Sequence, residues 1–199
     1  MRRWLVGAWF AILAADGRAH AFSPDADHFY SGLSHAFIDP AQLLLLLALG
    51  LLAAQRGDLG AARAIVTGVP LGALTFSLLP GDPAMLGVME AVVLGAAGTA
   101  GALVAWGRPL PRAWLQGLAV AAALGLGTVN GAELAREAWL APHLYLSGAA
   151  LGILMVLVAA FVAGSRLLEF AREWTSIAVR VAGSWLLASS LLLLALTAA

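Results

Sequence analysis

Six long apolar stretches, separated by short polar breaks, follow one another between residue 40 and the end of the chain. A helix needs about 20 apolar residues to cross the hydrocarbon core of a bilayer. Only 11% of the 199 residues are charged, whereas a soluble domain has about 25%. The chain is therefore predicted to be an all-α, polytopic membrane protein. We expect a bundle of six transmembrane helices whose first partner is the lipid bilayer.

Turn residues and charges set the limits of the predicted spans. The sequence Pro-Gly-Asp-Pro at residues 80–83 separates the second span from the third, and Gly-Arg-Pro at residues 107–109 separates the third from the fourth. The predicted spans cover residues 40–54, 61–79, 84–106, 112–131, 143–163 and 174–198. Together they form one transmembrane domain, residues 22–199, which follows an N-terminal segment of another kind.

That segment, residues 1–21, is typical of a secretory signal. Arg2 and Arg3 precede an apolar run of about a dozen residues, and Ala-His-Ala at residues 19–21 has the small-x-small form that signal peptidase accepts. The run is short for a span, which favours cleavage. Two charged residues just before the cleavage site favour retention as a signal anchor instead. With either outcome, the chain after residue 21 starts outside the cytoplasm.

The arginines are confined to alternate loops between the predicted spans. They lie in the first, third and fifth loops, whereas the second loop has none and the fourth has only Arg136. Cytoplasmic loops carry the excess of basic residues in membrane proteins. We therefore predict a multi-pass protein of the bacterial inner (cell) membrane, with both mature termini on the periplasmic or exterior side.

Several classes of function are disfavoured by what the sequence lacks. It has no cysteine, which excludes disulfides and thiolate metal sites. The net charge is zero and no basic cluster is present, which argues against nucleic acid as a partner. The motifs HExxH, GxSxG and GxxxxGK[ST] are missing. We therefore predict that the protein is not an enzyme.

Polar side chains at membrane depth are costly and usually face the protein interior or a cavity. Glu90, one to two turns into the third predicted span, is the strongest candidate of this kind. The other candidates mark the outer ends of spans: His35, Asp39, Gln42, Asn130, Glu133 and His143. Because successive spans alternate in direction, all these residues are predicted to lie toward the outer side of the membrane.

Two interpretations of these residues stay open. In the functional one, groups from several helices form an outward-facing cation pocket, because imidazole and oxygen ligands suit nickel, cobalt, zinc or copper(II). If residues 35–42 are helical, His35, Asp39 and Gln42 share one face. In the structural one, water and headgroups satisfy these residues near helix ends, and Asp39 caps the helix that starts at Pro40.

Helix contacts are predicted at small residues, because lipid tails compete with apolar side chains for contact. Gly68 and Gly72 stand four apart in the second span, and Gly148 and Gly152 repeat this spacing in the fifth.

The layout resembles that of the HupE/UreJ family, small membrane proteins linked to hydrogenase and urease operons. Residues 31–35 (SGLSH), 43–44 (LL) and 49–55 (LGLLAAQ) are similar to the family's first span, which reads like G-F-x-H-P-x-x-G-x-D-H-L-L followed by G-L-x-A-A-Q. Glu90 is similar to the glutamate that opens the family's third span. Residues 131–133 (GAE) resemble the end of the motif H-G-x-A-H-G-x-E. The resemblance covers nearly the whole chain and implies a nickel, or nickel and cobalt, permease.

The chain departs from the family's pattern at positions where the resemblance implies metal ligands. Alanines stand at positions 36 and 41, where the pattern has proline and aspartate, and Gln42 replaces the second histidine. Leu126 and Asn130 stand where the fourth-span motif has two histidines. Amides coordinate borderline metals poorly, so a lower nickel affinity is expected. The remaining candidate metal ligands are His35, Glu90 and Glu133. Gln42, Asn130 and Asp39 are additional candidates.

Two functions follow from these observations. The first is a permease-like transporter of a divalent metal ion such as nickel or cobalt, with an outward-facing polar site around Glu90. The second is a transport-inactive relative that serves as an accessory or structural subunit of a membrane complex, with other membrane protein subunits as partners. Neither function requires a bound cofactor, since the metal ion would be a substrate.

Overall fold

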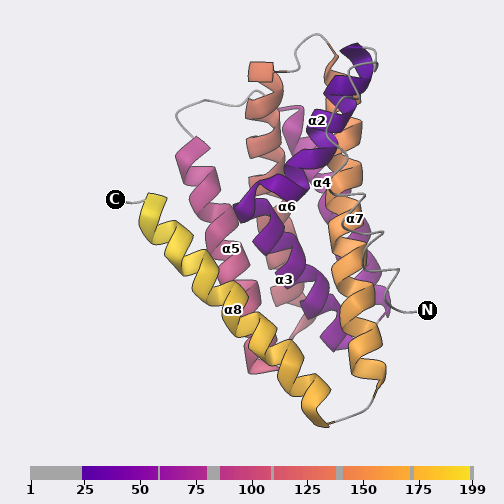
Figure 1. Cartoon of the computed structure of the whole chain (residues 1–199), viewed down its shortest axis with the longest axis vertical. Helices are drawn as coiled ribbons and strands as arrows, with labels where there is room; N and C mark the ends of the chain where they lie inside the picture. Colours follow the sequence, from indigo (N-terminus) through magenta and orange to yellow (C-terminus); the bar gives the residue numbers. More distant parts are fainter. Residues whose placement is uncertain are drawn as a thin grey trace, which may run out of the picture.

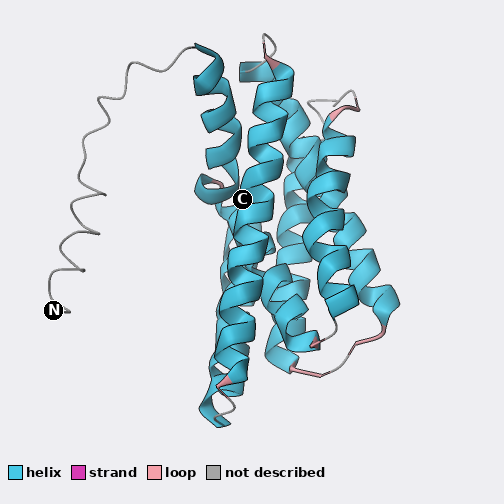
Figure 2. Ribbon diagram, turned by 90° about the vertical axis from the view of Figure 1, so that its right-hand side faces the viewer, coloured by secondary structure: helices cyan, strands magenta, loops and turns pink. Residues whose placement is uncertain are grey.

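The computed structural model describes residues 24–57, 59–79, 86–108, 110–137, 141–170 and 173–197. Within these ranges the chain is all helical, without a strand, which confirms the predicted class (Figures 1 and 2). The helices are α2 (Pro24–Ile38), α3 (Pro40–Arg56), α4 (Leu59–Ser77), α5 (Leu86–Trp106), α6 (Arg112–Glu137), α7 (Pro142–Glu169) and α8 (Glu173–Thr197). The predicted signal or signal anchor lies outside the described residues.

The lengths and compositions of the helices make this a multi-pass membrane protein. α5, α6, α7 and α8 are each long and apolar enough to cross a bilayer, and α2 with α3 passes the same test as one bent pair. The apolar part of α4, Ala62–Ser77, is shorter, and at 1.5 Å per residue it extends about 24 Å against a core of about 30 Å. The described residues thus contain four or five candidate spans, and the count of six stays a prediction.

Helix α2 corrects the expectation for the residues before the first span. The predicted spans begin only at residue 40, but residues 24–38 form a further helix that packs along α7. Glycines make this contact: a Cβ on Gly32 would lie 2.1 Å from the carbonyl oxygen of Tyr145, and one on Gly148 would lie 2.1 Å from that of Phe29. The two backbones therefore touch directly, as small residues allow in membranes.

The predicted glycine pairs behave differently from each other. Gly148 and Gly152 both face α2, where Gly152 approaches the carbonyl oxygen of Leu33, so this contact is confirmed. In the other pair, Gly72 faces the Cβ atom of Ala123 on α6, but Gly68 has no neighbouring atom within 4 Å. The prediction that Gly68 makes a helix contact was therefore wrong, because that face of α4 lies at an open groove.

Helix α3 forms the centre of the bundle. It packs against α7, α5 and α4, and its leucines Leu45, Leu46, Leu49 and Leu52 are buried. Its C-terminal end is closed by hydrogen bonds: Gln55 Nε2 donates to the carbonyl oxygen of Val104 at 3.0 Å, and Arg56 donates to that of Leu110.

Candidate functional site at a broken helix

The chain bends by 68° between α2 and α3. Figure 1 shows α2 descending from one end of the bundle to about its middle, where α3 begins. Pro40 occupies the first turn of α3 and disfavours a helical conformation at the residue before it. Asp39 accordingly leaves the helix, with φ −72° and ψ 113°. The sequence therefore breaks the helix at a defined residue.

Asp39 also stabilises the start of α3. Its Oδ1 accepts hydrogen bonds from the backbone N–H groups of Ala41 at 2.8 Å and Gln42 at 3.4 Å. These are two of the N–H groups that a helix leaves without an intrahelical partner at its N-terminus. The structural interpretation of Asp39 as a cap is thus confirmed. The break also separates His35 on α2 from Gln42 on α3, so residues 35–42 do not form the one helix on which a shared face depended.

A pair of buried amides lies at this end of α3. Gln42 is 1% exposed and Asn130, on α6, is 2% exposed. Gln42 Nε2 donates to Asn130 Oδ1 at 3.1 Å. Gln42 Oε1 is buried and has no hydrogen-bond partner among the described residues. A buried acceptor without a donor costs about 1–3 kcal/mol, so this oxygen is a position where a donor or a cation would be stabilised.

His35 lies on the α2 side of the break. Its ring stands edge-on to the ring of Tyr145 on α7, with centroids 6.3 Å apart and planes at 87°. Tyr145 is fully buried, whereas His35 is half-buried. α2, α3, α6 and α7 thus each contribute a polar or aromatic side chain near the break. Sequence reasoning missed Tyr145, because a single tyrosine near the start of an apolar span carries no positional signal.

The other predicted ligands lie apart from a common centre. Glu90 is exposed on the second turn of α5, and Glu133 is half-buried on α6, one turn beyond Asn130. His143 is exposed at the start of α7. In the described part of the chain, no three His, Asp or Glu side chains are close enough together to hold a metal ion. The structure therefore joins Gln42 and Asn130 by a hydrogen bond, and among the described residues it gathers no three of the His, Asp and Glu side chains around them.

The chemistry of this donor set differs from that of a nickel site. Imidazole is a good ligand for nickel and cobalt, whereas carbonyl oxygens suit harder cations such as magnesium and manganese. The amide pair offers one free oxygen and no formal charge. Gln42 and Asn130 do not fit a tight nickel site, although they occupy two positions where the resemblance expects histidines.

Comparison with known proteins adds the family to this description. A family model described as HupE / UreJ protein matches residues 8–193. No curated protein and no solved structure matches the chain. The family match includes every described helix except the last few residues of α8. The chain therefore belongs to the HupE/UreJ family.

Proposed function

We propose that this protein is a permease-like transporter of a small cation, with its binding site at the break between α2 and α3. The observation that carries the proposal is the buried Gln42–Asn130 pair at this break, where the C-terminal end of α2 meets α3. The C-terminal end of a half-helix is the end that favours a cation. Transporters commonly place substrate and ion sites at such breaks, near the middle of the membrane. Gln42 Oε1 supplies a buried acceptor there.

The cargo that the family suggests is nickel or cobalt. Amide oxygens in place of imidazoles lower the affinity expected for those ions and favour harder divalent cations. A cation panel therefore has to contain nickel, cobalt, magnesium and manganese. The outward-facing site around Glu90, predicted from the sequence, is a second location for the same activity.

Uptake into liposomes containing the purified protein tests this proposal. We expect Gln42→Leu to lower uptake of at least one of the four cations by tenfold or more, because it removes the buried amide. Gln55→Leu is the matched control, since it removes the same group from the other end of α3. Equal uptake by both variants, or uptake no faster than in empty liposomes, would contradict the proposal. Loss in Glu90→Gln with full uptake in Gln42→Leu would move the site to the start of α5.

A gain-of-function variant sharpens the test. Replacing both amides by histidine, in the double variant Gln42→His with Asn130→His, supplies two imidazoles at one place. We expect nickel uptake to rise relative to that of magnesium, because imidazole prefers nickel. Unchanged selectivity would show that these two side chains do not contact the cargo.

The second candidate function, an accessory subunit of a membrane complex, is supported by a groove between α7 and α8. α7 and α8 spread apart toward one end of the bundle, with α3 between them (Figure 1). The groove has a volume of about 550 Å³. Four alanines line it: Ala160, Ala163, Ala178 and Ala182. Small residues allow the close approach of a partner's helix.

The native mass of the complex in mild detergent tests this alternative. An accessory subunit should migrate as part of a larger assembly, and Ala163→Leu should release it by filling the groove. Migration of the wild-type protein as a single chain in detergent would contradict the accessory role.

A further inference from the structure

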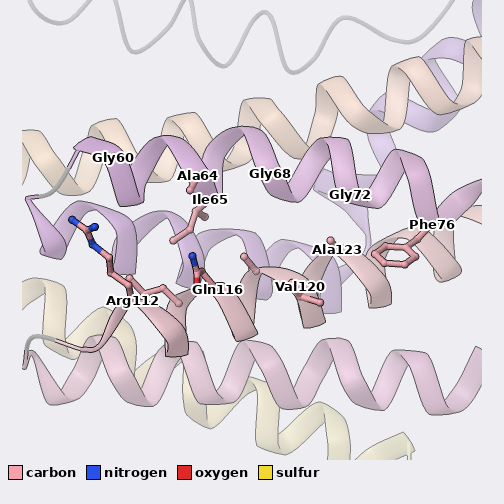
Figure 3. A pocket seen from close by; sticks show the side chains of 12 residues that line it. Gly60, Ala64, Ile65, Gly68, Gly72, Phe76, Arg112, Gln116, Val120 and Ala123 are labelled. Carbon is pink, nitrogen blue, oxygen red and sulfur yellow. The ribbon is translucent and has the colours of Figure 1, made fainter.

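A second groove, with a volume of about 590 Å³, runs between α4 and α6. Figure 3 shows α4 along one side and α6 along the other, with Arg112 and Gln116 near the end marked by Gly60 and Phe76 at the opposite end. Neither Gln42 nor Asn130 lines this groove. The groove is therefore a different site from the proposed cation site.

Apart from Ile65 and Phe76, the α4 wall of this groove consists of glycines and an alanine. Gly60, Ala64, Gly68 and Gly72 follow one another at four-residue intervals, so they form one stripe along the helix. At 1.5 Å per residue the stripe from Gly60 to Gly72 is about 18 Å long. Half of the hydrocarbon core is about 15 Å thick. The stripe is thus a smooth apolar channel about as long as one leaflet is deep.

The two ends of the groove differ in polarity. Arg112 and Gln116, in the first two turns of α6, are the polar side chains in its lining, and both are exposed. Arg63, on α4 close to Gly60, is exposed as well. Beyond them the lining is apolar as far as Phe76. A ligand that matches this surface has an anionic group at one end and an apolar chain behind it.

The predicted orientation puts the polar end at the cytoplasmic face, where the leaflet carries anionic lipids. Basic pockets between transmembrane helices on that side bind lipid headgroups. We propose that the groove binds one anionic phospholipid of this leaflet. Its phosphate contacts the guanidinium of Arg112 and the amide of Gln116, and one acyl chain lies along the stripe on α4.

A transmembrane helix is a poorer match for the groove. A helix that spans the membrane presents an apolar surface to its neighbours, so it would leave the polar end of the groove, with Arg112 and Gln116, without a matching group.

The test uses native mass spectrometry of the purified protein in an uncharged detergent. The probes are phosphatidylglycerol and phosphatidylcholine with identical acyl chains, each added at the same concentrations. We expect one phosphatidylglycerol per chain, bound at least fivefold more tightly than phosphatidylcholine. Arg112→Gln should remove this preference, because it removes the positive charge. Gly68→Leu should weaken binding of both lipids, because the new side chain fills the channel.

Two control variants keep the test specific. Arg108→Gln removes an exposed arginine that lies at the same end of the bundle, over the ring of Trp106, and does not line the groove. Gly95→Leu adds a leucine at another glycine with no atom within 4 Å, on α5. Both should bind phosphatidylglycerol as the wild type does. Gly68 has the same open surroundings, so Gly68→Leu should fold.

Three results would overturn the proposal. The first is equal binding of the two lipids by the wild-type protein. The second is unchanged binding in Arg112→Gln and Gly68→Leu. The third is a lower oligomeric mass in Gly68→Leu, which would assign the groove to a protein contact. None of these outcomes depends on cation uptake, so the lipid site can be disproved without disproving the proposed transport, and the reverse.

Discussion

The two ends of α3 carry the same side chain in different surroundings. Gln42, near the N-terminus, is buried, and its Oε1 has no partner among the described residues. Gln55, near the C-terminus, is half-buried and donates to the carbonyl oxygen of Val104. The C-terminal end is a closed structural junction, while the N-terminal end retains an unused acceptor. The difference shows that residue type and helix position alone do not tell which of the two amides is left with an unmatched acceptor.

The largest effect is expected where α2 covers the N-terminal end. Gly148→Leu should destabilise the fold by about 3 kcal/mol, at the upper end for overpacking, because its Cβ would lie 2.1 Å from the carbonyl oxygen of Phe29. Thermal unfolding in detergent measures this loss. Gly87→Leu, at a glycine with no atom within 4 Å, should be close to neutral. Hydrogen exchange should rise at residues 35–42 more than at residues 50–56, and an equal rise at both ends would contradict this account.

A middle-sized effect should follow from breaking the amide pair. Asn130→Leu leaves the Gln42 amide buried without its acceptor, which costs about 1–3 kcal/mol. Adding Gln42→Leu removes the remaining polar group, so the double variant should recover part of that loss. A thermodynamic cycle of the two single variants and the double variant measures the coupling, expected at about 0.6–2 kcal/mol for a hydrogen bond in a membrane. Strictly additive effects would show that the two amides do not interact.

The smallest effect should come from the caps of α3. Asp39→Ala removes the N-terminal cap at a cost of about 1 kcal/mol. Gly57→Ala places a Cβ in the left-handed region, at φ +62°, also for about 1 kcal/mol. The two variants should therefore lower thermal stability equally. Only Asp39→Ala should lower cation uptake, and equal losses of uptake would remove the functional distinction between the two ends.

The sequence predicted much of the helical architecture, because apolar stretches, arginines and turn residues act locally. It also named Gln42 and Asn130, which do meet in the fold. It missed the break, since Asp39 and Pro40 are typical both of a helix start at the membrane surface and of a helix start within the bundle. Only the packing of α2 against α7 distinguishes these cases.

Glu90 illustrates a second limit. Hydropathy identified its depth in an apolar stretch, but depth does not tell which way a helix face points. Apolar residues are spread almost evenly over all faces of α5, so its sequence has no single apolar face that would orient the helix. The fold leaves Glu90 exposed on the second turn. Direction depends on contacts with α3, α6 and α8, which are far away in the sequence.

The amide pair at the break also makes this buried contact insensitive to acid. Histidines at positions 42 and 130 would gain charge as the pH falls through the range from 8 to 5, and would then repel a cation and each other. Carboxamides carry no charge throughout that range. The hydrogen bond between α3 and α6 therefore does not change with the pH on either side of the membrane in that range.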